Sequence, residues 1–192
     1  MFRNFIKDER GMAVLFLYFM IIFLVLGVVT FDFSRAHAVR ARLRTAVDAA
    51  ALAGVMTARA QCEYDYVPID EDGDGVPDRI EQKLKAVHMS VYDKNRADKD
   101  AGETYGKNMP KSNKWGVRTE PGSIKSDVIP DTYYKEKKGV HCYGDSYAYE
   151  AVARVKAFLM SGALAGWLVG VDEKEREIPV KAKGTAQVVP TL

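Results

Sequence analysis

The pattern of apolar residues along the chain changes sharply near residue 31. Residues 12–31 form an apolar run without a charged side chain. As a helix, about 20 residues at about 1.5 Å each span the roughly 30 Å core of a bilayer. A cleaved signal sequence has a shorter apolar region, of about 7–15 residues, and a small-residue cleavage site, whereas this run ends in Phe31, Asp32 and Phe33. We therefore expect residues 1–31 to be a short charged head followed by a helix that lies in a membrane or in the core of a filament.

Beyond the apolar run, the pattern predicts that the same helix continues with one apolar face. No proline occurs between residues 32 and 60, and alanine, arginine and leucine, which favour helices, dominate. Apolar or small residues recur at spacings of three and four, at Val39, Leu43, Val47, Ala50, Ala51 and Gly54. The opposite side carries Arg40, Arg42, Arg44 and Asp48. We assign residues 32–61 to this amphipathic continuation, and residues 62–192 to a globular extracytoplasmic domain.

An acidic loop at residues 70–81 has the ligand spacing of an EF-hand calcium loop. Gly75 stands at the sixth position, where the loop must bend sharply. The predicted Ca²⁺ ligands are the side chains of Asp70, Asp72, Asp74, Asp78 and Glu81 and the backbone carbonyl of Val76. Oxygen ligands of this kind suit Ca²⁺, and the alternative is an acidic surface turn. The loop resembles the D-x-D-x-D-G-x-x-D loops of extracellular bacterial and thrombospondin-type repeats, which implies a structural role for the ion.

The segments on either side of this loop predict half of an EF-hand. Pro68 argues against a helix before the loop. After the loop, Ile80, Leu84, Val87 and Val91 recur at spacings of three and four. This stripe predicts a helix that runs to about Tyr92.

The remaining segments predict a small sheet with long loops. Residues 93–144 are polar and without a clear period, so we expect loops there and a short strand at residues 114–118. Apolar and polar residues alternate over residues 150–157 and again over residues 178–188, which predicts two strands. Between them, residues 161–169 read as a short apolar helix. The predicted fold class is α+β: a long helix that carries a small antiparallel-sheet head domain.

The two cysteines and the charges bear on where the chain lies. Cys62 and Cys142 both follow the apolar run, at the edges of the polar middle region, and we expect a disulfide between them, with two free thiols as the alternative. A disulfide suits a periplasmic or extracellular location. Arginines flank the apolar run on both sides, so the positive-inside rule does not fix the orientation. The cysteines favour the N-terminus inside and the bulk of the chain outside.

Composition adds two exclusions. The net charge of +2 is too small to indicate a nucleic-acid partner. The chain has no P-loop, nucleophile elbow or zinc motif. We therefore do not expect an enzyme.

The first sixty residues also resemble a known family. Asp8-Glu9-Arg10-Gly11 precedes the apolar run, Asp32 and Arg35 follow it at a D-x-x-R spacing, and residues 46–54 read AVDAAALAG. These motifs resemble the N-terminal signature of the tight-adherence (Tad, or Flp) pilus-assembly proteins, the TadE/TadG-like pilin relatives. Many prepilins carry a glutamate five residues after the cleaved glycine, whereas Phe16 stands in the fifth place after Gly11. This difference favours the TadG-like branch or an unprocessed subunit.

The resemblance implies a pilin-like α+β head and a helix that assembles with other subunits. The residues expected to carry assembly are Gly11, Met12, Leu15, Phe19, Phe23, Leu26, Phe31, Asp32 and Arg35. The expected partners are copies of this chain or other pilus subunits, with the membrane before assembly. The expected location is the bacterial inner membrane as a single pass, or an extracellular pilus filament.

Three functions remain open from the sequence. The first is a structural subunit, major or minor, of a Tad-like or type IV-like filament. The second is a single-pass inner-membrane component of the pilus assembly machinery. The third, weaker reading is a membrane-anchored calcium-binding adhesin.

Overall fold

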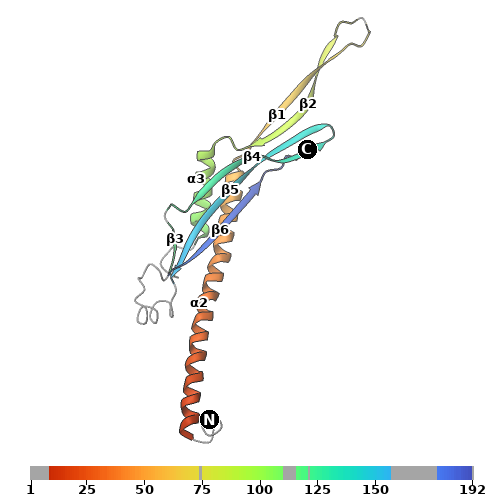
Figure 1. The fold of residues 1–192 in the computed structure, drawn as a ribbon. Helices are drawn as coiled ribbons and strands as arrows, with labels where there is room; N and C mark the ends of the chain where they lie inside the picture. Colours follow the sequence, from red (N-terminus) through yellow and green to blue (C-terminus); the bar gives the residue numbers. More distant parts are fainter. Residues whose placement is uncertain (1–8, 74, 110–115, 121, 157–176, 192) are drawn as a thin grey trace. The chain divides into compact units, whose positions relative to one another are not determined.

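The long N-terminal segment is one continuous helix, and a sheet domain follows it (Figure 1). The computed structural model describes residues 9–73, 75–109, 116–120, 122–156 and 177–191. The elements are α2 (Glu9–Val55), β1 (Arg59–Ile69), β2 (Arg79–Ser90), α3 (Lys94–Asn108), β3 (Val117–Thr119), β4 (Lys125–Lys137), β5 (Val140–Lys156) and β6 (Glu177–Gln187). The predicted α+β class is confirmed.

The chain divides into two compact units. The first comprises residues 1–41, 112–118 and 153–180, and the second comprises residues 42–111, 119–152 and 181–192. The second unit contains the last turns of α2, the β1–β2 hairpin, α3, β4 and most of β5.

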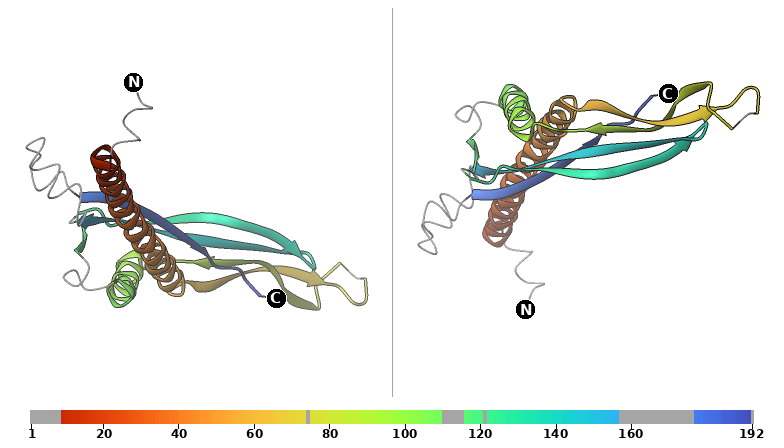
Figure 2. Two further views of the ribbon diagram at one scale, coloured as in Figure 1. Left: turned by 90° about the horizontal axis from the view of Figure 1, so that it is seen from below. Right: turned by 90° about the horizontal axis from the view of Figure 1, so that it is seen from above.

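The sheet has six strands and is organised around β5, its longest strand. β2 pairs with β5 in parallel, over the short stretch that joins Ala86–Met89 to His141–Gly144. β4 pairs with β5 antiparallel along most of its length, with an irregularity between Ile129 and Tyr133. β1 pairs only with β2, antiparallel, and is therefore an edge strand. In both views of Figure 2, the β1–β2 hairpin and the β4–β5 hairpin run side by side.

The amphipathic part of α2 packs through small residues, as its spacing predicts. Val39, Leu43, Val47, Ala50, Ala51 and Gly54 are all buried, whereas Arg40, Arg42, Arg44 and Asp48 are exposed. Within the second unit, a Cβ atom added to Gly54 would lie 2.4 Å from two ring carbons of Tyr147 on β5. A Cβ atom added to Gly184 on β6 would lie 2.8 Å from the carbonyl oxygen of Val47. Helix and sheet therefore approach each other more closely than a side chain at either glycine allows.

The helix α3 lies in the region where the sequence predicted loops and one short strand. Asp93 caps its first turn, because the Asp93 side chain accepts a hydrogen bond from the backbone N–H of Arg96. Its buried residues are Ala97, Ala101 and Tyr105. Their spacing of four is the signal that could have revealed this helix. β4 and part of β5 also lie in the predicted loop region. The strand predicted at residues 114–118 overlaps β3 at residues 117 and 118, while residues 114 and 115 lie outside the described residues.

The two C-terminal strands were predicted correctly from their alternating pattern. β5 extends further towards the N-terminus than expected, and β6 begins one residue earlier. The apolar helix predicted at residues 161–169 lies outside the described residues.

Buried tyrosines hold α3 against the sheet. Tyr147 and Tyr149 of β5 are among the largest fully buried side chains. The Tyr147 hydroxyl donates to the Asp98 carboxylate at 2.6 Å, and the Tyr149 ring contacts that of Tyr105 with centroids 5.6 Å apart. Burial raises the pKa of Tyr149 to about 12. Burial, together with the Asp98 carboxylate, raises the pKa of Tyr147 further.

These pKa shifts predict a loss of stability at alkaline pH. Tyrosines of the unfolded chain ionise near pH 10, whereas Tyr149 in the folded chain keeps its proton to about pH 12. The contribution is therefore complete below pH 10 and is lost as the pH rises towards 12. Thermal unfolding of the full chain in detergent, followed by circular dichroism from pH 8 to 12, measures this. Tyr149→Phe should weaken the pH dependence, and an unchanged dependence in that variant would contradict the assignment.

Candidate functional site

The first candidate site is the apolar surface of α2. From Gly11 to Val55, this helix is long and apolar enough to cross a membrane, and the described part of the chain buries none of its most apolar stretch. The predicted assembly residues Met12, Leu15, Phe19, Phe23, Leu26 and Phe31 are between 40% and 70% exposed, while Gly11 is buried. So large an apolar surface requires lipid or other protein surface around it.

The two polar residues predicted for assembly differ from the apolar ones, because both are largely buried. Asp32 is 8% exposed, and its carboxylate lies 4.0 Å from the Arg35 guanidinium one turn later. Arg35 also donates to the carbonyl oxygen of Lys156, at the end of β5 in the same unit, at 3.5 Å. The pair therefore fixes the helix to the end of a strand, a role that differs from contact with a neighbouring subunit.

The segment after the acidic loop is a strand, so the predicted helix at residues 80–92 is wrong. β1 and β2 form a hairpin whose register runs from Arg59 opposite Ser90 to Ile69 opposite Arg79. Apolar residues at helical spacing did not distinguish the two structures, because pairing with β1 decides the conformation. We call residues 63–85 the hairpin arm. All of its residues in β1 except Ile69, and most of those in β2, are exposed, and the arm reaches beyond the β4–β5 turn (Figures 1 and 2).

The acidic loop forms the tip of the hairpin arm. Asp70 accepts hydrogen bonds from the backbone N–H groups of Gly73, at 2.7 Å, and Gly75, at 2.9 Å. Both glycines have positive φ, 75° and 83° respectively, a conformation that glycine adopts without strain. Asp78 accepts from the N–H of Glu71 at 2.7 Å. The loop is therefore closed by carboxylates that bind backbone at both of its ends.

Three of the predicted calcium ligands come together at this tip. Carboxylate oxygens of Asp70, Asp72 and Asp78 all lie within 4.8 Å of one another, and all three side chains are exposed. Glu81 does not join this group, because it lies on β2 opposite Val67. Val76 lies in the exposed turn, and Asp74 is outside the described residues. The half EF-hand is therefore replaced by a hairpin tip with three converging carboxylates.

The predicted disulfide is not formed, and the sheet explains why. Cys62 lies on β1 opposite Val87, and Val87 on β2 lies opposite Cys142 on β5. One strand thus separates the two cysteines, which places their Cα atoms roughly 10 Å apart at about 4.8 Å per strand. A disulfide requires a Cα separation below about 7 Å. Both thiols are free, that of Cys62 exposed and that of Cys142 buried.

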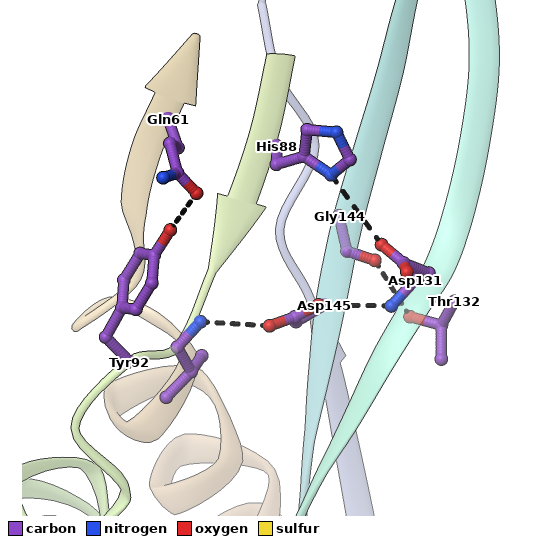
Figure 3. Close-up of polar contacts among 8 residues, drawn as sticks. Gln61, His88, Tyr92, Asp131, Thr132, Gly144 and Asp145 are labelled. Atoms are coloured by element: carbon purple, nitrogen blue, oxygen red, sulfur yellow. Dashed lines mark hydrogen bonds and ion pairs between the residues drawn. The ribbon is translucent and has the colours of Figure 1, made fainter. Parts of the chain in front are cut away.

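A buried carboxylate that the sequence analysis missed joins three strands where the hairpin arm meets the sheet (Figure 3). Asp145 on β5 is 6% exposed. Its carboxylate accepts from the N–H of Val91, just after β2, at 3.0 Å and from the N–H of Asp131, in the irregular part of β4, at 3.1 Å. Its backbone carbonyl accepts from Val188 at 3.1 Å. No sequence signal marks this residue, since an aspartate in a strand is usually exposed.

An aromatic row crosses the same part of the sheet. His88 of β2 stacks on Tyr143 of β5 with ring centroids 4.4 Å apart, and Tyr143 contacts Tyr134 of β4 at 5.2 Å. The His88 ring also lies 4.0 Å from the Asp131 carboxylate (Figure 3). Tyr134 and Tyr143 lie opposite each other on the paired strands β4 and β5.

Comparison with known proteins gives a family match that covers nearly all of α2. Residues 11–60 match a family model described as "Putative Flp pilus-assembly TadE/G-like". This part of the chain is TadE/G-like. The TadE/G-like segment contains the apolar and amphipathic parts of α2 and ends where β1 begins. No curated protein and no solved structure matched the chain.

The match agrees with the geometry at particular residues. The TadE/G-like segment includes the Asp32–Arg35 pair, the buried alanines and Gly54. The hairpin arm and the Asp145 network lie outside it. The family match therefore covers the membrane-type helix and its packing face, while all but the start of the sheet domain lies outside the matched residues.

Proposed function

We propose that this chain is a pilin-like structural subunit of a Tad-type or type IV-like surface filament and polymerises through α2. The observation that carries the proposal is the division of α2 into two halves. Among the described residues nothing covers its apolar half, while its amphipathic half packs on the sheet. Before assembly, lipid covers the apolar half, and in the filament identical helices replace the lipid.

Small residues support this exchange of lipid for protein. Without a hydrophobic driving force inside the bilayer, helices associate through close packing and interhelical hydrogen bonds. The apolar half of α2 contains Gly11, Ala13 and Gly27, and no atom lies within 4 Å of where a Cβ of Gly27 would be. The proposed orientation places the N-terminus in the cytoplasm and the sheet domain outside the inner membrane.

The alternative is a single-pass inner-membrane component of the assembly machinery. Phe16 favours it, because this residue stands where many prepilins have a glutamate. In this alternative α2 stays in the bilayer and the sheet domain acts there.

Mass spectrometry on filaments sheared from the cell surface separates the two functions. A filament subunit should be abundant in that fraction, and its first residue shows whether residues 1–10 are removed. Absence from the sheared fraction, with the chain retained in the inner membrane, would contradict the filament role and favour the assembly component. A known inner-membrane protein serves as the control for contamination.

We also propose that the tip of the hairpin arm binds Ca²⁺. The support is the convergence of the Asp70, Asp72 and Asp78 carboxylates, which would repel one another without a cation. Calcium takes six to eight oxygen ligands, so backbone carbonyls, water and the remaining loop carboxylates would complete the shell. Its role would be to hold the tip rigid.

The calcium proposal predicts weak, tip-dependent binding. Equilibrium dialysis of the full chain against ⁴⁵Ca²⁺ should give a Kd of about 10⁻⁴–10⁻³ M, as in extracellular modules. Asp70→Asn removes a charge and keeps one of the two side-chain oxygens that accept from the N–H groups of Gly73 and Gly75. It should weaken binding at least about tenfold because affinity follows ligand charge. Asp65→Asn, on the same arm but away from the tip, is the control. Equal affinity of Asp70→Asn and wild type would contradict the proposal.

A further inference from the structure

The hairpin arm has an apolar face that nothing in the described part of the chain covers. Alternate residues of a strand share a face, so the paired residues Tyr64 and Leu84, Tyr66 and Gln82, and Pro68 and Ile80 lie on one side of the arm. Tyr64, Tyr66 and Ile80 are 47%, 64% and 68% exposed. A two-stranded hairpin alone is marginally stable in water. An arm of this length therefore gains stability from a partner on this face.

The charge of the hairpin arm indicates the charge that its partner must carry. Residues 63–85 contain eight acidic and three basic residues, a net charge of −5. The rest of the chain contains eighteen acidic and twenty-five basic residues, a net charge of +7. Two arms repel each other, whereas the arm of one copy and the body of another attract. This charge complementarity favours a second copy of the chain, contacted through a basic part of its body.

The β4–β5 turn offers the complementary surface. Lys135, Lys137 and Lys138 lie at this turn, and all three are exposed. Lysine side chains can lay their aliphatic stems on an apolar surface while their amines reach carboxylates. One such turn can therefore contact both the tyrosines of the arm and its acidic groups.

We propose that the hairpin arm of one copy docks on the β4–β5 turn of a neighbouring copy, so that Lys135, Lys137 and Lys138 meet the carboxylates of the arm. The contact is heterologous, since two different surfaces meet, and repeated contacts of this kind generate a ring or a helical array. This contact extends the proposed filament function, and its place in a filament rests on that function. In the filament it adds an interface between head domains to the one between helices.

The first test is carbodiimide cross-linking of the full chain, in detergent and in sheared filaments, with EGTA present to remove Ca²⁺ as a variable. The reagent takes up water as a carboxylate and a lysine amine in contact form an amide. A mixture of ¹⁴N- and ¹⁵N-labelled copies distinguishes the products, because a contact between copies gives mixed-isotope peptides. We expect mixed peptides that join residues 63–81 to residues 135–138. Their absence, or peptides of one isotope only, would overturn the proposal.

Charge reversal is the second test. Glu81→Lys on the arm or Lys135→Glu on the turn should lower the yield of mixed peptides from the remaining carboxylates and lysines about tenfold. The double variant restores opposite charges and should recover most of the yield. Glu103→Lys and Lys99→Glu, on exposed positions of α3, are matched controls that should leave it unchanged. Circular dichroism checks the fold of each variant, and the wild-type result decides the matter if a variant does not fold.

The outcomes separate this contact from the filament role. Sheared filaments that contain the chain but give no mixed peptides between arm and turn refute the contact and leave the filament role intact. Mixed peptides in detergent from a chain that is absent from sheared filaments support the contact and refute the filament role. Equal yields from Glu81→Lys and Glu103→Lys would show that the arm's charge does not direct the contact.

Discussion

Asp145→Ala is expected to destabilise the sheet domain by about 2–4 kcal/mol, since hydrogen bonds to charged groups contribute about 1.5–3 kcal/mol each. The substitution leaves two backbone N–H groups without their acceptor. The N–H group of Val91 is buried and cannot form a hydrogen bond to water instead. The N–H group of Asp131 is partly accessible to water. Thermal unfolding of the full chain in detergent, followed by the near-ultraviolet circular dichroism of the tyrosines, measures the effect. At about 2–4 °C per kcal/mol for a chain of this size, the Tm should fall by at least about 4 °C.

The control for Asp145 is Asp127→Ala on the neighbouring strand β4. Asp127 is exposed and lies 3.8 Å from the amine of Lys94. Exposed ion pairs contribute about 0–1 kcal/mol, so its loss should change the Tm little. A similar decrease in Tm for both variants would show that the Asp145 carboxylate is not the link between β2 and β4. Proteolysis within the hairpin arm should increase in Asp145→Ala alone, because Val91 closes the strand that ends the arm.

Gly54→Ala is expected to destabilise the same domain by about 1–3 kcal/mol, the range for overpacking a filled core. The new Cβ would lie 2.4 Å from the Tyr147 ring. That ring cannot easily move, since it is fully buried and its hydroxyl is bonded to Asp98. The expected loss already includes the roughly 1 kcal/mol that alanine gains over glycine in a helix. Thermal unfolding under the conditions used for Asp145 gives the comparison.

Gly106→Ala tests whether the Gly54 effect is steric. Gly106 lies in α3, and no atom lies within 4 Å of where its Cβ would be. This substitution should therefore raise stability by up to about 1 kcal/mol through helix propensity alone. If Gly54→Ala were also stabilising, the close approach of α2 to Tyr147 would be wrong.

The helix and the two C-terminal strands could be predicted because their burial repeats regularly. Leu43 and Val47 are fully buried, and Arg44 between them is exposed, so the period of the helix is visible in the sequence. The hairpin arm offers no such signal. Ile80 and Leu84 lie four residues apart, a spacing that fits one face of a helix and one face of a strand equally well. The conformation there depends on pairing with β1, which a local pattern does not contain.

The sequence predicted the candidate site only where its residues lie close together along the chain. The acidic tip lies within nine residues, and its spacing brought Asp70, Asp72 and Asp78 together as expected. The cysteines and Asp145 depend on which strands are neighbours. β2 lies between β1 and β5, so Cys62 and Cys142 are kept apart, while Asp145 reaches backbone groups of two other segments. Neither arrangement follows from spacing along the chain.

The close contact of Gly184 with the backbone of Val47 and Asp48 also sets the order in which this protein can mature. The surface beneath β6 belongs to a helix that precedes every described strand in the chain, and the strand that covers it is the last of the described strands. Until that strand arrives, the alanine face of the helix has an incomplete partner and β5 has an open edge. The domain therefore completes its fold only after β6 has been made. During that interval, its exposed strand edge is the part of the molecule most in need of protection from aggregation.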